Sequence, residues 1–185
     1  MHIKIIFKPF FNPIATCLLV MVFLASCGDS HKKNAKNTNI QSKEFQDKLV
    51  EANKMYVKQE SDEIDQYINH RGWNMTATGT GLRYMITKKG DGEPAVAEKF
   101  ARVKYKISLL DGTVCYSSDS TGARDFLVGQ DHVESGLHEA IQLMHVGDKA
   151  TFILPSHLAH GLIGDENKIP PKASVIYDIE LLAVH

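Results

Sequence analysis

The chain has 185 residues and a formal net charge of −1, with 43% hydrophobic and 23% charged residues. This length and balance are typical of one soluble globular domain with an additional segment. A near-neutral charge argues against a nucleic-acid-binding surface, so no nucleic-acid partner is expected. Three cysteines, of which Cys17 falls in the N-terminal apolar run, do not supply a disulfide framework.

The N-terminus carries the pattern of a secretory leader. Lys4 and Lys8 precede an apolar run over 14–25, which is shorter than the roughly 20 residues needed to span a bilayer. The run ends in Leu-Ala-Ser-Cys-Gly, which resembles the cleavage box of bacterial lipoproteins, where the cysteine is acylated. We expect a lipoprotein signal peptide over 1–26 and a membrane anchor through lipid on Cys27, outside the cytoplasm in the cell envelope. The alternative is an ordinary signal peptide with an unmodified cysteine.

Two segments of different character follow. Residues 27–42 are polar, and this composition predicts a flexible tether. Between Phe45 and Ile68 the apolar residues recur mostly three or four positions apart, which predicts an amphipathic helix within 43–72 that Gly72 stops. Its charged residues are expected to face solvent. The helix is interpreted as packing on the domain, extending the tether, or joining copies of the chain into a homo-oligomer.

The remainder, over 79–185, has the pattern of short strands and one helix. Strict alternation over 102–110 followed by Asp-Gly predicts a strand and a hairpin turn. Apolar residues at Leu137, Ala140, Ile141 and Met144 lie on one face of a short helix. The other strands are expected at 82–87, 113–116, 149–154 and 173–182, and residues 76–81 are expected to form a turn-rich boundary.

Three ordered motifs near the C-terminus resemble the FKBP-type peptidyl-prolyl isomerases. They are Leu-Ala-His-Gly at 158–161, Ile-Pro-Pro at 169–171, and Ile-Tyr-Asp-Ile-Glu-Leu-Leu at 176–182. The resemblance extends over 79–185 and implies an FKBP-type isomerase domain of the α+β class: a curved antiparallel sheet wrapped around one short helix, with the N-terminal helix outside. The lipoprotein leader, the single helix and Tyr-Ser-Ser at 116–118 are also similar to the gliding-motility-associated FKBP-type lipoproteins of Bacteroidetes.

The family resemblance implies a prolyl cis-trans isomerase that acts on proline-containing polypeptide clients and assists the folding of exported or envelope proteins. Such a site needs an apolar pocket and a few hydrogen-bond donors, and it requires no cofactor and no metal. Ile169, held by the two prolines after it, is expected to be an exposed wall of the pocket. By resemblance, the catalytic positions are Tyr105, Tyr116, Val133, Glu134, Leu137, His160, Ile169 and Tyr177, and the substrate pocket also includes Cys115 and Phe126.

Some of these positions differ from the family pattern. Cys115, Tyr116, Leu137 and His160 stand where the family has Phe, Asp, Trp and Tyr. These differences motivate a second hypothesis, a non-catalytic chaperone or assembly factor of the cell envelope with the same fold. A third hypothesis is a structural lipoprotein that oligomerises through its N-terminal helix.

The histidines suggest a rival site. His138 and His145 share one face of the predicted helix, with His132 just before it, and His157 and His160 are three positions apart. Metal sites use such spacings. However, no cysteine pair or carboxylate completes a recognised ligand pattern, so a metal site is the weaker interpretation.

Overall fold

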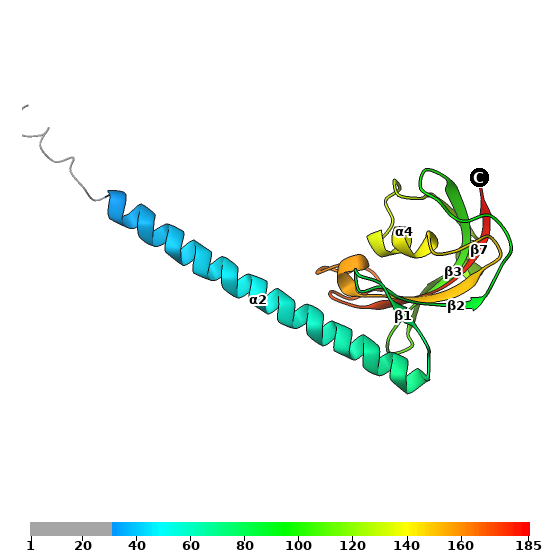
Figure 1. Ribbon diagram of the computed structural model, residues 1–185, viewed down its shortest axis with the longest axis horizontal. Helices are drawn as coiled ribbons and strands as arrows, with labels where there is room; N and C mark the ends of the chain where they lie inside the picture. The colour runs from blue at the N-terminus through cyan, green and yellow to red at the C-terminus, as the bar shows by residue number, and fades with distance from the viewer. Residues whose placement is uncertain (1–30) are drawn as a thin grey trace, which may run out of the picture. The chain divides into compact units, whose positions relative to one another are not determined.

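The computed structural model describes residues 31–185, beginning with the long helix α2, His31–Arg71 (Figure 1). Gly72 ends this helix in the left-handed region, with a φ of 63°. The N–H of Gly72 donates to Asn69 and the N–H of Trp73 donates to Ile68, both at 3.1 Å. These two bonds form the Schellman pattern that terminates many helices. The predicted stop at Gly72 is therefore confirmed.

The helix begins earlier than the composition predicted. The prediction of a flexible tether over 27–42 is wrong from His31 onward, because α2 already includes those residues. The segment 31–42 is polar, but it contains no Gly or Pro. Lysine, glutamine and alanine all have good helix propensity, so polarity alone does not prevent the helix from extending. The predicted signal peptide and Cys27 lie outside the described residues.

One antiparallel sheet of seven strands forms the body of the domain. Its spatial order is β1-β2-β6-β7-β3-β4, and β5 also pairs with β3. The strands are β1 Thr76–Ala77, β2 Arg83–Lys88, β3 Phe100–Leu109, β4 Val114–Ser117, β5 Arg124–Leu127, β6 Lys149–Leu154 and β7 Val175–Val184. The helical elements are α3 Ser118–Thr121, α4 Ser135–Ile141 and the 3₁₀ turn η2 Ser156–Leu158. The bridge of β1 with β2 was not predicted, since its residues have the composition of a turn.

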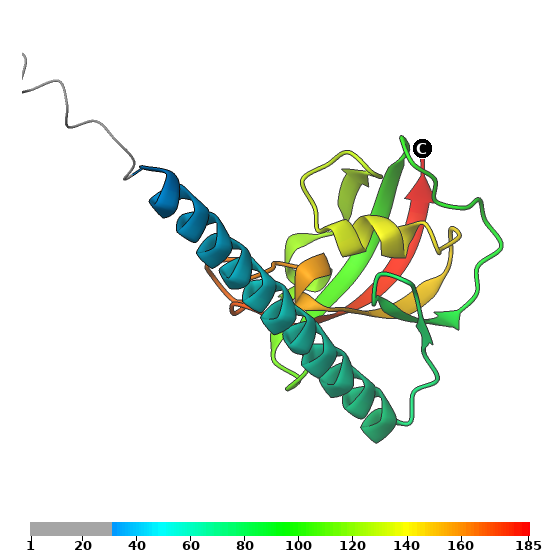
Figure 2. The same cartoon turned by 60° about the vertical axis from the view of Figure 1, so that its left-hand side comes forward.

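The helix α4 lies against one face of the curved sheet, as both ribbon views show (Figures 1 and 2). Its residues Leu137, Ala140 and Ile141 are buried. They pack in one cluster with inward-facing residues of the strands, among them Val103 of β3 and Leu181 of β7. The strict alternation seen in the sequence places these strand residues on the inner face. The predicted α+β fold is confirmed.

The opposite face of the sheet is covered too. Ile153 of β6 pairs with Ile176 of β7, and both pack with Ile64 and Ile68 of α2 in a second buried cluster. Trp73 contributes to this cluster, so it packs as expected. The residues 53–185 form one compact unit that includes this part of α2. Burial on both faces explains why β6 is a nearly continuous apolar run.

Candidate functional site

A small cavity lies between the inner face of the sheet and α4. Sequence-predicted residues from four different elements contribute to its lining: Tyr105 of β3, Phe126 of β5, Leu137 of α4 and Tyr177 of β7. The other lining residues are Val103, Ile107, Arg124 and Ile179. The cavity has a volume of about 20 Å³, which is about the space that one water molecule needs. A pyrrolidine ring therefore requires a lining side chain to move.

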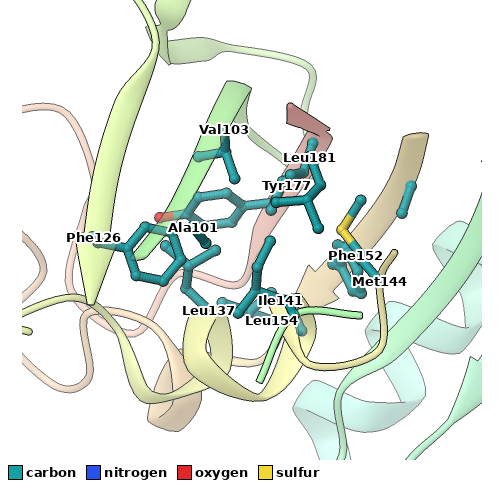
Figure 3. Packing of buried hydrophobic residues seen from close by; sticks show 14 of the residues in the cluster. Ala101, Val103, Phe126, Leu137, Ile141, Met144, Phe152, Leu154, Tyr177 and Leu181 are labelled. Atoms are coloured by element: carbon teal, nitrogen blue, oxygen red, sulfur yellow. The ribbon is translucent and has the colours of Figure 1, made fainter. Parts of the chain in front are cut away.

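Tyr177 is the aromatic centre of this cavity. Its side chain is buried, and its ring lies between Val103 and Leu137 with the hydroxyl end toward Phe126 (Figure 3). Burial raises the pKa of Tyr177 well above 10, and the negative charge of the neighbouring Glu134 carboxylate raises it further. The phenol is therefore neutral and acts as a donor.

Glu134 links the cavity to a neighbouring loop. It occupies the position before α4, but its side chain makes no capping bond. Instead, its Oε1 atom lies 2.8 Å from Nε2 of His160, while the carboxylate also neighbours Tyr177 and raises the pKa of its hydroxyl. Among the described residues the backbone N–H of Glu134 has no backbone acceptor.

The loop after His160 is held by Asp165. Its Oδ1 atom accepts from the N–H of Asn167 at 3.0 Å and from the N–H of Ile169 at 2.7 Å, and its other oxygen accepts from the Tyr116 hydroxyl. Desolvation acts to raise the pKa of Asp165, but the hydrogen bonds from Tyr116, Ile169 and Asn167 outweigh it and lower this pKa from 3.8 to about 2. Asp165 thus stabilises the loop as a carboxylate.

The expectation of an exposed Ile169 is wrong. Its side chain is 2% exposed and packs in the main core, because the hydrogen bond from its N–H to Asp165 turns the loop inward. Tyr116 holds this same loop and does not line the cavity. The structure therefore separates the predicted site residues into four that line the cavity and others that surround it.

The remaining predicted positions lie near this region. Val133 is half-buried against the core. Cys115 is buried, and its thiol approaches the carbonyl oxygen of Lys168 at 3.6 Å. Burial raises the pKa of the Cys115 thiol, which disfavours the reactive thiolate.

Sequence reasoning missed two contributors to this region. Arg124 lines the cavity from an exposed strand end, and no pattern in the sequence distinguishes it from other surface arginines. Asp165 was also missed, although the spacing Asp-x-Asn over 165–167 is a recognisable turn signal.

Two of these histidines form structural hydrogen bonds. Nδ1 of His138 accepts from the N–H of Gly129 at 2.8 Å, and its Nε2 atom lies 3.0 Å from the carbonyl oxygen of Asp131. Nε2 of His157 lies 3.1 Å from the carbonyl oxygen of Thr80. Over the part of the chain that the structure describes, no group of three or more potential ligands from His, Cys, Asp and Glu comes together.

No helix within 31–185 is long and apolar enough to cross a bilayer.

Comparison with known proteins places this geometry in context. Residues 91–182 match the family described as FKBP-type peptidyl-prolyl cis-trans isomerase. The chain is similar to a probable FKBP-type peptidyl-prolyl cis-trans isomerase FkpA of Neisseria meningitidis serogroup B, with 33% identity over 144 residues, 76% of this chain and 52% of the relative. The chain spans about half the length of the first curated relatives it matches.

Two solved structures are similar to this chain in fold. The structure of FkpA from Escherichia coli superposes with a TM-score of 0.58 and 25% identity, covering 94% of this chain and 82% of the other. The structure of AtFKBP13 superposes with a TM-score of 0.57 and 27% identity, covering 60% of this chain and 99% of the other.

Proposed function

Because this chain belongs to the FKBP-type peptidyl-prolyl cis-trans isomerase family, we propose that it catalyses the cis-trans rotation of X–Pro bonds. The proposed clients are proline-containing segments of exported or envelope proteins that are still folding. The observation that carries the proposal is the apolar and aromatic cavity formed by Tyr105, Phe126, Leu137 and Tyr177.

The chemistry suits such a cavity. Rotation about an X–Pro bond crosses a barrier of about 18–20 kcal/mol, because the planar amide is stabilised by resonance. Twisting removes this resonance and makes the amide less polar. A dry cavity therefore stabilises the twisted imide relative to the planar one, and binding energy that appears only in the transition state speeds the reaction. The N–H of Glu134 is the proposed donor to the carbonyl next to the proline.

The cavity must open for this reaction. Leu137 and Tyr177 are buried in the core, whereas Tyr105 is only half-buried. The Tyr105 hydroxyl forms a hydrogen bond of 3.2 Å with Oγ1 of Thr121 at an exposed position. We propose that the Tyr105 side chain swings outward and that the pyrrolidine ring takes the space it leaves, against Phe126 and Tyr177.

The test is an NMR exchange or protease-coupled assay of the full chain on X–Pro peptides. The wild-type protein should accelerate exchange over buffer, and Phe126→Ala should lower kcat/KM at least tenfold because it removes a cavity wall. Phe100→Ala is a matched control, since Phe100 is exposed and does not line the cavity. A wild-type rate equal to that of buffer rejects catalysis.

A second candidate function is favoured by the cavity volume of about 20 Å³. A cavity too small for a pyrrolidine ring suits a fold that binds unfolded client segments elsewhere on its surface and does not catalyse rotation. Suppression of aggregation of a proline-free unfolded protein, by a wild-type chain that shows no isomerase activity, would favour this function over the first.

The cellular setting is part of the proposal. We propose that lipid on Cys27 anchors the chain in the bacterial envelope, as the leader motif supports. Mass spectrometry of the membrane fraction would detect acylated Cys27, and an unmodified cysteine rejects the anchor.

A link to gliding motility, supported only by resemblance, predicts defective colony spreading in a deletion strain. Self-association through α2 predicts a dimer or larger species in light scattering, whereas a monomer rejects it.

A further inference from the structure

Glu60 is a buried carboxylate that the proposed reaction does not use. It lies on α2 with 5% of its surface exposed. It accepts hydrogen bonds from the N–H of Ser156 at 2.7 Å, from Oγ of Ser156 at 3.1 Å and from Oγ of Ser174 at 2.8 Å. A buried carboxylate needs such donors, because removing a charge from water is costly unless hydrogen bonds replace its hydration.

The two serines lie at the two ends of one loop. The segment 156–174 leaves the sheet after β6 and returns to it at β7. It contains His160, Asp165 and Ile169, which surround the candidate site. Glu60 therefore joins the start and the end of this segment through one side chain.

Further hydrogen bonds connect the same two ends. The N–H of Gly161 donates to the carbonyl oxygen of Ser156 at 2.8 Å, and the N–H of Lys172 donates to that of Gly161 at 2.9 Å. The Tyr56 hydroxyl of α2 then donates to the carbonyl oxygen of Lys172 at 3.1 Å. The base of the loop is thus closed on itself and fixed to α2 at two points, Tyr56 and Glu60.

This chain of contacts reaches the cavity. His160 directly precedes Gly161, and its ring contacts Glu134. The Glu134 carboxylate in turn neighbours Tyr177, which lines the cavity. The path from α2 to Glu134 is therefore made of direct contacts, and the position of His160 depends on how firmly the base of its loop is held.

We propose that Glu60 is a positioning residue of the candidate site, through which α2 fixes the loop that presents His160 to Glu134 and Tyr177. The inference rests on the proposed isomerase function for its catalytic readout. It assigns to the N-terminal helix a role in the activity of the domain that follows it.

The test compares Glu60→Ala and Glu60→Gln with Glu63→Ala in the full chain. Glu63 is exposed on the same helix and serves as the control. Glu60→Ala should lower kcat/KM for X–Pro peptides at least fivefold, mainly through kcat, and raise amide hydrogen exchange at Gly161 and Lys172 at least tenfold. Glu60→Gln keeps one oxygen that can accept from the N–H of Ser156 and from Oγ of Ser174, and its NH2 group can donate to Oγ of Ser156, so it should stay within about threefold of the wild type.

A local effect must be separated from loss of the fold. Exchange that rises at Gly161 and Lys172, but not at central amides of β6 and β7, supports the proposal. Equal increases at all of these amides, or no change in Glu60→Ala, overturn it. Ser174→Ala removes only one of the three bonds and should show a smaller local increase even if Glu60→Ala does not fold.

Failure of the proposed function gives a different pattern. A wild-type chain without isomerase activity rejects catalysis. The positioning role of Glu60 is then tested by two other measurements on Glu60→Ala: amide hydrogen exchange at Gly161 and Lys172, and the affinity for a proline peptide in an NMR titration. Unchanged exchange and affinity in Glu60→Ala would overturn positioning by Glu60.

Discussion

Nε2 of His160 lies 2.8 Å from a carboxylate oxygen of Glu134, and the same carboxylate neighbours the Tyr177 hydroxyl and helps to raise its pKa. Three side chains from a loop, a helix start and a central strand thus meet at the edge of an apolar cavity. Since the side chains of His160 and Glu134 are only 23% and 14% exposed, each polar group depends on its protein neighbours, more than on water, for polar contacts. The cavity therefore has a polar rim next to Tyr177.

The first prediction concerns the Tyr177 hydroxyl. Tyr177→Phe keeps the ring and leaves Glu134 bonded to His160, so we expect kcat/KM within about threefold of the wild type and a stability loss of about 1 kcal/mol. Tyr177→Ala empties the cavity wall, and we expect a loss of about 3–5 kcal/mol together with background activity. Urea denaturation and the X–Pro assay measure both. If the two variants are equally inactive, the hydroxyl network and not the ring carries the activity.

The second prediction concerns acid stability. The pKa of Asp165 falls from 3.8 to about 2 on folding, so its carboxylate stabilises the folded state at pH values above about 4, and this contribution is lost as the pH falls toward 2. Asp165→Asn should therefore be less stable than the wild type at pH 6, and the difference should shrink between pH 4 and pH 2. Urea denaturation across this range measures it. A constant difference down to pH 2 contradicts the lowered pKa.

The third prediction concerns Arg83, whose side chain is 10% exposed. It donates to both carboxylate oxygens of Asp65, to Ser61 and to the carbonyl oxygen of Gly81. Arg83→Lys cannot reproduce this fork, and we expect a loss of about 1–3 kcal/mol.

The matched control makes the same exchange at the surface. Arg102 pairs with Asp125 at 3.0 Å, but the two side chains are 53% and 38% exposed. Arg102→Lys should change the free energy of unfolding by less than about 0.5 kcal/mol. Equal losses of unfolding free energy in the two variants would mean that burial does not determine how much the Arg83 contacts stabilise the fold.

The fourth prediction concerns Gly164 in the loop that Asp165 holds. Its φ is 74°, and an added Cβ would lie 2.2 Å from the carbonyl oxygen of Ile169. Gly164→Ala should therefore cost more than about 1 kcal/mol and should raise hydrogen exchange at Ile169. Gly79→Ala is the control, because no atom lies within 4 Å of its added Cβ. A Gly164→Ala protein with wild-type exchange at Ile169 contradicts the tight closure of this loop.

Much of the fold was predictable because the pattern of apolar residues in a strand or helix directly reports burial. The strand predicted over 149–154 has the observed bounds of β6, and the alternation over 102–110 marks β3 closely. The single helix α4 was predicted from its 3.6-residue period. Local patterns suffice at these positions, since β3 and α4 each bury one face against the same core and β6 is a nearly continuous apolar run.

The second face of the sheet was not predictable in the same way. Ile153 and Ile176 fall on the face that alternation alone assigns to solvent, and only the packing of α2 buries them. Glu60 shows the same limit. The charged residues of α2 were expected to face solvent, which is wrong for Glu60, although its spacing of four from Tyr56 and from Ile64 places it on the buried side.

The candidate site was predictable only in part. Tyr105, Phe126, Leu137 and Tyr177 come together in the cavity, because strand and helix periodicity point them inward. The roles of Tyr116 and Ile169 depend on loop geometry, which Asp165 sets through hydrogen bonds between residues that no period relates.

Ile153 and Ile176, on the sheet face that α2 covers, affect which fragments of this protein stay soluble and how the protein unfolds on heating. A fragment that starts after Gly72 would present Ile153 and Ile176 to water, and such adjacent apolar strand residues promote self-association. The last turns of α2 should therefore unfold together with the sheet in a single calorimetric transition. The smallest soluble fragment of this chain should begin before Tyr56.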